Sequence, residues 1–143
     1  MSSGTELFNL KGKRALITGS SQGIGFALAK GLDEAGAEII LNGRNKEKLE
    51  KAAKALTPQN NMYQLSFDVT DKNEIENVVN KFENEIGSIE ILVNNAGMQH
   101  RTPLEDFPPD KFEQLLKTNI SSVFNVSQVV ARHMIKRGSG KII

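Results

Sequence analysis

The sequence predicts an α/β fold in which a doubly wound parallel sheet carries helices on both faces. Short apolar runs alternate with segments of helical periodicity along all 143 residues, a pattern typical of parallel strands joined by crossover helices. A glycine-rich turn, Thr18-Gly19-Ser20-Ser21-Gln22-Gly23-Ile24-Gly25, follows the first apolar run and opens a helix. Polar residues also follow later runs, and ligands of such folds bind where the strands end.

Five strands are expected from the apolar runs, which are short and bounded by turn residues or helix starts. The first run has a continuous apolar centre, as in parallel strands that are covered on both faces. The expected strands are residues 13–18, 38–42, 62–67, 89–93 and 141–143.

Four helices are expected between these strands, over residues 24–35, 45–56, 71–86 and 110–137. The last of them is expected to break near Asn119, and Asp71 with Glu74 predicts a capping box at the start of the third. In the first helix, one stripe at helical spacing comprises Ile24, Leu28, Leu32 and Ala35.

The last helix carries apolar side chains on more than one side. The set expected to face the sheet comprises Ile120, Val123, Phe124 and Val130. A second apolar surface comprises Val126, Val129 and Met134.

Composition excludes several classes of function. The net charge is +1, so nothing attracts the chain globally to nucleic acid or anionic membranes. It has no cysteine, which excludes disulfides and cysteine-bound metals and fits a reducing cytoplasm. No signal peptide is expected at the N-terminus, where residues 1–9 are expected to form a loose arm, and no apolar run is long enough to span a bilayer.

The chain stops at Ile143, in the middle of the fifth expected strand. A buried strand needs neighbours for its backbone groups and apolar side chains. We therefore expect residues 1–143 to be the N-terminal part of a single nucleotide-binding domain, truncated at the fifth strand.

The glycine-rich turn predicts a phosphate site. A helix N-terminus offers unpaired N–H groups and a partial positive charge, and glycines allow a phosphate to approach the backbone closely. Taken alone, the same pattern also fits an ordinary connection between a strand and a helix.

The second strand ends in Leu41-Asn42-Gly43-Arg44, without the carboxylate that usually binds a ribose 2′-hydroxyl about 20 residues after the glycines. A guanidinium suits a 2′-phosphate, which it binds through paired, charge-assisted hydrogen bonds. Arg44 therefore favours NADP over NAD. The alternative is a surface arginine in the loop that enters the next helix.

Two more strand ends carry polar side chains. Asp68 ends the third strand, where its carboxylate could accept a hydrogen bond from the adenine amino group or cap the next turn. Asn94-Asn95-Ala96-Gly97 ends the fourth strand. Its small residues would allow a ribose or nicotinamide to approach closely, although alone it is only a turn signal.

Together these motifs resemble the short-chain dehydrogenase/reductase family. The resemblance rests on the glycine pattern of residues 18–25, on Asp68-Val69, on Asn94-Asn-Ala-Gly97 and on Asn119, in this order and at this spacing. It covers essentially the whole chain, and it implies a Rossmann fold with a nicotinamide cofactor.

The resemblance implies a role for each motif. Gly19, Gly23 and Gly25 would hold the pyrophosphate, and Asn119 would be a catalytic asparagine that perturbs its helix and anchors a water. For Asn119 the alternative is an outward-facing polar residue. The other residues expected at the cofactor are Ser20, Ser21, Gln22, Ile24, Asn42, Gly43, Arg44, Asp68, Val69, Asn95, Ala96 and Gly97.

Within the family, three stretches resemble the bacterial gluconate 5-dehydrogenases, also called 5-ketogluconate reductases. These stretches are residues 39–45, 94–103 and 131–134. They imply an NADP-dependent interconversion of D-gluconate and 5-dehydro-D-gluconate. His100 and Arg101 are candidate substrate contacts, because a polyhydroxy carboxylate needs hydrogen-bond donors and a positive charge. A solvent-facing loop or a subunit contact explains them equally well.

The family's catalytic serine and Tyr-x-x-x-Lys pair have no match in this chain, whose single tyrosine, Tyr63, lies in the third expected strand. We expect residues 1–143 alone to be inactive. Two alternatives stay open: another short-chain reductase, acting on 3-oxoacyl groups or sugar alcohols, or a dinucleotide-binding module without catalysis. A third, an S-adenosylmethionine-binding fold, is disfavoured because it offers no counterpart to residues 94–97 and Asn119. In this family the helix that corresponds to residues 110–137 packs against a partner subunit, which implies a homo-oligomer, usually a tetramer. The competing explanation is that the C-terminal half of the intact protein covers this helix.

Overall fold

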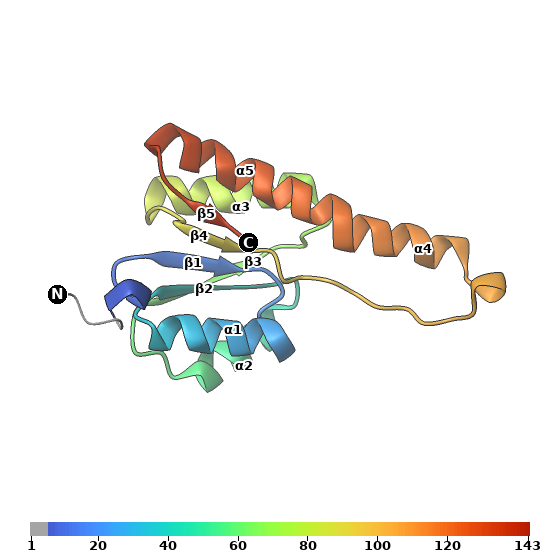
Figure 1. Ribbon diagram of the computed structural model, residues 1–143, viewed down its shortest axis with the longest axis horizontal. Helices are drawn as coiled ribbons and strands as arrows, with labels where there is room; N and C mark the ends of the chain where they lie inside the picture. Colours follow the sequence, from blue (N-terminus) through green and yellow to red (C-terminus); the bar gives the residue numbers. More distant parts are fainter. Residues whose placement is uncertain (1–5) are drawn as a thin grey trace.

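The computed structural model describes residues 6–143 as a parallel sheet between two layers of helices (Figure 1). Its strand order is β3-β2-β1-β4-β5, and every pairing is parallel. The predicted fold class is therefore confirmed. The strands are β1 (Arg14–Ile17), β2 (Glu38–Gly43), β3 (Met62–Ser66), β4 (Ile91–Val93) and β5 (Lys141–Ile142).

Helices cover both faces of the sheet. α1 (Gly23–Glu34) and α2 (Lys46–Leu56) pack on one face, and α3 (Lys72–Glu85) and α5 (Ser122–Arg137) pack on the other (Figure 1). α4 (Pro109–Leu116) extends beyond the sheet on the side toward which the strands point. Three short helical segments complete the described part of the fold: η1 (Glu6–Phe8), η2 (Leu104–Asp106) and the π-helical turn η3 (Lys117–Ser121).

The core has two halves because successive residues of a strand point to opposite faces of a sheet. In the central strand β1, Ala15 and Ile17 pack toward α1 and α2, whereas Leu16 packs toward α3 and α5. All three are fully buried. The continuous apolar run of β1 thus reflects a strand that is covered on both faces.

The buried face of α1 differs from the expected stripe. Ile24 is 76% exposed and Leu28 is 40% exposed, while Gly25, Ala29 and Asp33 are the buried residues of the helix. The physical reason is that the start of α1 lies very close to the ends of β1 and β4, so only small side chains fit between them. The expected stripe was therefore wrong at its N-terminal end.

The last helix is broken as expected, and its faces were assigned correctly only in part. Asn119 lies at the centre of the π turn η3, which separates α4 from α5. Val130 packs in the core as expected, and Val126, Val129 and Met134 pack there beside it. From the set expected to face the sheet, Ile120 and Phe124 are exposed instead. The π turn adds a residue to one turn, which changes the phase between the two helices.

The third helix begins as predicted, with a different partner for Glu74. The Asp71 carboxylate accepts hydrogen bonds from the N–H groups of Asn73 and Glu74 and so caps α3. The Glu74 carboxylate accepts from the N–H of Asp68 at 2.8 Å, which replaces the reciprocal bond of a capping box. Glu74 therefore holds the end of β3 to the start of α3.

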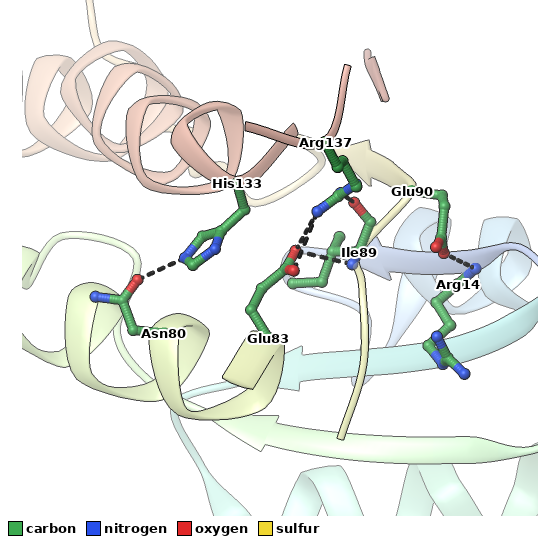
Figure 2. A network of polar contacts seen from close by, with 7 residues as sticks. All are labelled: Arg14, Asn80, Glu83, Ile89, Glu90, His133 and Arg137. Atoms are coloured by element: carbon green, nitrogen blue, oxygen red, sulfur yellow. Dashed lines mark hydrogen bonds and ion pairs between the residues drawn. The ribbon is translucent and has the colours of Figure 1, made fainter. Parts of the chain in front are cut away.

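A polar network joins α3, α5 and the approach to β4 (Figure 2). The Glu83 carboxylate, only 5% exposed, lies 3.1 Å from the Arg137 guanidinium and accepts the Ile89 N–H at 2.9 Å. Arg137 also donates to the Ile89 carbonyl, and His133 contacts Asn80 at 2.7 Å. These bonds satisfy the backbone of Ile89 on both sides, where the chain enters the sheet.

Two expectations concern the chain ends and the membrane. Of the loose arm expected for residues 1–9, residues 1–5 lie outside the described residues, and Glu6–Phe8 form the 3₁₀ turn η1. Across residues 6–143, no helix has both the length and the hydropathy that a bilayer span requires.

Candidate functional site

A cleft of about 680 Å³ opens where β1, β2, β3 and β4 end. Its walls come from the glycine-rich turn, the three neighbouring strand ends, and α4 with the π turn. The lining residues that were predicted to bind a cofactor are Gly19, Ser21, Gln22, Gly23, Asn42, Gly43, Arg44, Asp68, Val69, Asn95, Ala96 and Gly97. The structure thus brings together most of the predicted cofactor residues.

The glycine-rich turn has the geometry of an anion cradle. Gly19 and Gly23 have φ values of +62° and +61°, in the left-handed region that favours glycine. The turn passes directly into α1, whose N-cap residue, Gln22, makes no side-chain hydrogen bond to the helix. The first N–H groups of α1 are therefore not capped by that side chain and face the end of the turn, where an anion can bind.

The turn is held tightly against the end of β4. The Thr18 hydroxyl accepts hydrogen bonds from the N–H groups of Asn95 and Ala96, both at 3.0 Å. In return, the Asn95 side chain donates to the carbonyls of Thr18 and Gly19 at 3.0 and 3.2 Å. We call this contact between the glycine-rich turn and the end of β4 the seam. It leaves no room for a side chain at Gly25, where an added Cβ would lie 2.4 Å from Asn95 Nδ2 and 2.6 Å from the Gly19 oxygen.

Three predicted cofactor residues do not line the cleft. The Ser20 side chain is fully buried and donates to the Ile17 carbonyl at 2.7 Å. Gly25 is buried behind the turn, and the Ile24 side chain points to the surface. These residues shape the turn from behind it, and direct contact between them and a cofactor stays a prediction.

Arg44 and Asp68 face each other across the ends of β2 and β3. The Arg44 side chain is 82% exposed, and its Nη1 lies 3.8 Å from Asp68 Oδ2. A pair this long and this exposed leaves the guanidinium available to another anion. Its position beside Gly43 and Ser21 at the cleft wall is compatible with a ribose phosphate.

The carboxylate of Asp68 is held in its charged form. Partial burial acts to raise its pKa, but hydrogen bonds from the Thr70 N–H and hydroxyl and the charges of Arg44 and Lys117 outweigh burial, so the pKa is lowered. Both Thr70 bonds are 2.8 Å long and end on Oδ1. Because the folded-state pKa is depressed, the stability that Asp68 adds is lost as the pH falls through that pKa.

Several lining residues were not predicted: Asn45, Lys48, Phe67, Thr70, Met98, Gln114, Lys117 and Thr118. Lys48 lies at the start of α2, four residues after Arg44, a proximity that was available in the sequence. Gln114 and Lys117 reach the cleft only because α4 extends beyond the sheet, which sequence periodicity does not reveal. The lining set holds three cationic side chains (Arg44, Lys48 and Lys117) and one carboxylate (Asp68), a balance that suits an anionic ligand.

Asn119 is joined to the end of the fourth strand. Its side-chain oxygen accepts from the Met98 N–H at 2.8 Å, and its side-chain nitrogen donates to the Met98 carbonyl at 3.0 Å. The side chain also approaches Gly97, where an added Cβ would lie 3.2 Å from Asn119 Oδ1. Asn119 thus binds the backbone just after Asn94-Asn95-Ala96-Gly97, and its catalytic role stays a prediction.

The two predicted substrate residues lie in the loop before α4, outside the set that lines the cleft. The His100 ring contacts the Thr102 hydroxyl at 2.8 Å and packs edge-on against Phe107, with ring centroids 5.3 Å apart. Arg101 is exposed, and its guanidinium donates to the Gln99 side-chain oxygen at 3.4 Å. Their role in substrate binding stays a prediction.

Tyr63 has a structural environment. Its hydroxyl donates to Glu38 at 3.4 Å, and its ring packs edge-on against Phe82 with centroids 5.3 Å apart. It is not among the residues that line the cleft. The interpretation of Tyr63 as a strand residue therefore agrees with its surroundings.

Replacing Gly25 tests the geometry of the seam. We expect Gly25→Ala to lower the free energy of unfolding by about 1–3 kcal/mol, because the new Cβ overlaps backbone atoms, and to weaken nucleotide binding at the turn. Gly31 is the matched control, since it lies in the same helix with nothing within 4 Å of an added Cβ. Gly31→Ala should be neutral or stabilising by up to about 1 kcal/mol. Equal thermal unfolding and nucleotide affinity in the two variants would contradict the described packing.

Comparison with known proteins agrees with this geometry. Residues 13–143 match the family model described as short chain dehydrogenase. The chain is similar to a gluconate 5-dehydrogenase of Gluconobacter oxydans (49% identity over 139 residues, covering 96% of this chain and 54% of the relative). It is also similar to a 5-keto-D-gluconate 5-reductase of Escherichia coli (46% identity, covering 96% of this chain and 55% of the relative).

Among solved structures, the chain resembles a gluconate 5-dehydrogenase from Burkholderia cenocepacia in complex with NADP and tartrate. The TM-score is 0.92 at 48% identity, over 98% of this chain and 55% of that one. The chain therefore spans about half the length of the relatives that it matches. By the family model, the relatives and the fold alike, this chain belongs to the short-chain dehydrogenase/reductase family.

Proposed function

We propose that the intact protein is an NADP-dependent oxidoreductase that interconverts D-gluconate and 5-dehydro-D-gluconate. The observation that carries the cofactor assignment is Arg44, an exposed guanidinium at the end of β2, on the wall of a cleft that also holds the glycine-rich turn. The substrate assignment is supported by the gluconate 5-dehydrogenase and 5-keto-D-gluconate 5-reductase at 49% and 46% identity.

The residues of the cleft fit NADP. Gly19 and Gly23 with the start of α1 would bind the pyrophosphate. Arg44, together with Ser21 and Lys48 from the same cleft lining, would bind the 2′-phosphate, and Asp68 would accept from the adenine amino group. Asn95, Ala96 and Gly97 would lie along the nicotinamide half. When bound, the cofactor supplies hydride transfer.

The chain's own contribution to the reaction is positioning. Asn119 would keep the main chain at Met98 in place beside the reacting end of the cleft, through its two bonds to that residue. We propose that residues 1–143 form the N-terminal part of a single Rossmann domain, and that the remaining acid–base residues belong to the rest of the intact protein. The cytoplasmic location stays a prediction.

The function is tested by following the reduced nicotinamide absorbance of the intact protein with gluconate and 5-ketogluconate against NADP and NAD. We expect activity on both substrates, with a preference for the phosphorylated cofactor. Arg44→Asp should lower kcat/KM for NADP(H) by roughly 10- to 100-fold and shift preference toward NAD, because charge-assisted bonds to the 2′-phosphate are lost.

Lys46 offers a matched control, since it is exposed two residues away and Lys46→Asp makes the same change in net charge. An equal loss in both variants would show only a general charge effect.

Comparable efficiency with NAD and NADP in the unsubstituted protein would overturn the cofactor assignment, and activity confined to 3-oxoacyl or sugar-alcohol substrates would overturn the substrate assignment. Cofactor binding without turnover of any of these substrates would favour a dinucleotide-binding module.

Arg101 is proposed to pair with the carboxylate of the sugar acid. Arg101→Ala should raise the KM for gluconate about tenfold, with kcat changed much less, because a ground-state ion pair is removed. Arg132, exposed on α5, is the control position. An unchanged KM in Arg101→Ala would remove Arg101 from the substrate site.

We propose that the intact protein is a homo-oligomer, with a tetramer expected. Phe112, Leu116, Ile120 and Phe124 recur every four residues along α4, η3 and α5 and are between 45% and 64% exposed. An apolar stripe of this length marks a surface that another chain segment covers. Light scattering of the intact protein should give a multiple of the subunit mass, and a monomeric mass would contradict the proposal.

A further inference from the structure

Asn42 is a polar side chain buried inside the sheet, with 1% of its surface exposed. It lies near the end of β2, and its amide makes three hydrogen bonds. Its Oδ1 accepts from the Gly19 N–H at 3.1 Å. Its Nδ2 donates to the Leu65 carbonyl at 3.0 Å and to the Phe67 carbonyl at 3.2 Å.

On one side, Asn42 holds the glycine-rich turn. Gly19 is hydrogen-bonded to two amide side chains, since its N–H donates to Asn42 and its carbonyl accepts from Asn95. These two asparagines come from β2 and from the end of β4, the strands on either side of β1. The backbone of Asn42 adds two bonds to Ser20, both 2.9 Å long. The left-handed conformation of Gly19 is thus held from two neighbouring strands.

On the other side, Asn42 holds the end of β3. Regular pairing of β2 with β3 stops at Gly43 and Ser66. The bond from Asn42 to the Phe67 carbonyl lies one residue beyond that point. It therefore fixes the backbone immediately before Asp68, on an edge strand that has no partner on its outer side among the described residues.

We propose that Asn42 is a positioning residue that couples the pyrophosphate-binding turn to the adenosine side of the cleft and thereby sets the affinity for NADP. The inference rests on the proposed cofactor. A side chain at this place must both accept from Gly19 and donate to β3, which an amide does and an aliphatic side chain cannot. Without it, the half-buried Gly19 N–H and the carbonyls of Leu65 and Phe67 lose a partner, and each can recover a protein partner only by a shift of the backbone.

The test is direct binding of NADP and of adenosine 2′,5′-bisphosphate to the intact protein by calorimetry. Asn42→Ala should raise both dissociation constants about tenfold, because the fragment spans the phosphate and adenine contacts that Asn42 connects. At saturating cofactor, kcat should change by less than about twofold, since Asn42 does not approach the reacting end of the cleft.

Asp33→Ala is the matched control for a general loss of stability. Asp33 is 4% exposed and accepts from the N–H groups of Gln59 and Asn60 at 2.8 and 3.0 Å, at the opposite end of the sheet. Both variants should unfold at a lower temperature, and only Asn42→Ala should bind the two probes more weakly. Asn42→Ser, whose hydroxyl is too short to span the three partners, should behave like Asn42→Ala.

Three results would overturn the inference: unchanged dissociation constants in Asn42→Ala, the same weakening in Asp33→Ala, or loss of folding in both Asn42 variants while Asp33→Ala folds. The last result would make Asn42 a residue of the fold alone. Failure of the unsubstituted protein to bind NADP would instead overturn the proposed function, and with it the basis of the inference.

Discussion

The central strand β1 is paired in parallel on both sides, and the rest of the molecule depends on that constraint. Parallel pairing with β2 and β4 brings three carboxyl ends to one edge of the sheet. The backbone N–H and carbonyl groups that lie just beyond the regular strand pairing still need hydrogen-bond partners. Thr18, Asn42 and Asn95 supply those partners. The cleft therefore lies where the strands end, and its shape follows from the hydrogen bonds that Thr18, Asn42 and Asn95 make at those strand ends.

Much of this arrangement could be predicted from local pattern. The apolar runs and glycine turns locate the strands to within one or two residues, because burial on both faces leaves a strong signal. Arg44 and Asp68 could be assigned to the cleft because each stands at a strand end, and strand ends of a parallel sheet meet at one edge. Lys48 lies four residues after Arg44, in the first turns of α2 rather than at a strand end, and was missed.

Other features depend on packing that no short pattern contains. The buried face of α1 runs through Gly25 and Ala29 because the helix presses on the seam between β1 and β4, so the larger side chains turn outward. The faces of α5 depend on the extra residue in η3. The Ser20 hydroxyl turns inward to the Ile17 carbonyl, and the Asn42 amide bonds to Gly19, Leu65 and Phe67, which lie more than 20 residues away in the sequence. Residue type alone suggested only that the two side chains contact a ligand.

The π turn makes the orientation of α4 relative to α5 depend on the number of residues between them. Each residue of a helix turns the chain by about 100° and advances it by about 1.5 Å. Deleting one residue between Lys117 and Ser121 would rotate α4 by that angle relative to α5 and carry Gln114 and Lys117 away from the cleft. Insertions and deletions in this segment should therefore be far less tolerated than substitutions, because the number of residues in η3 sets the rotation of α4 relative to α5.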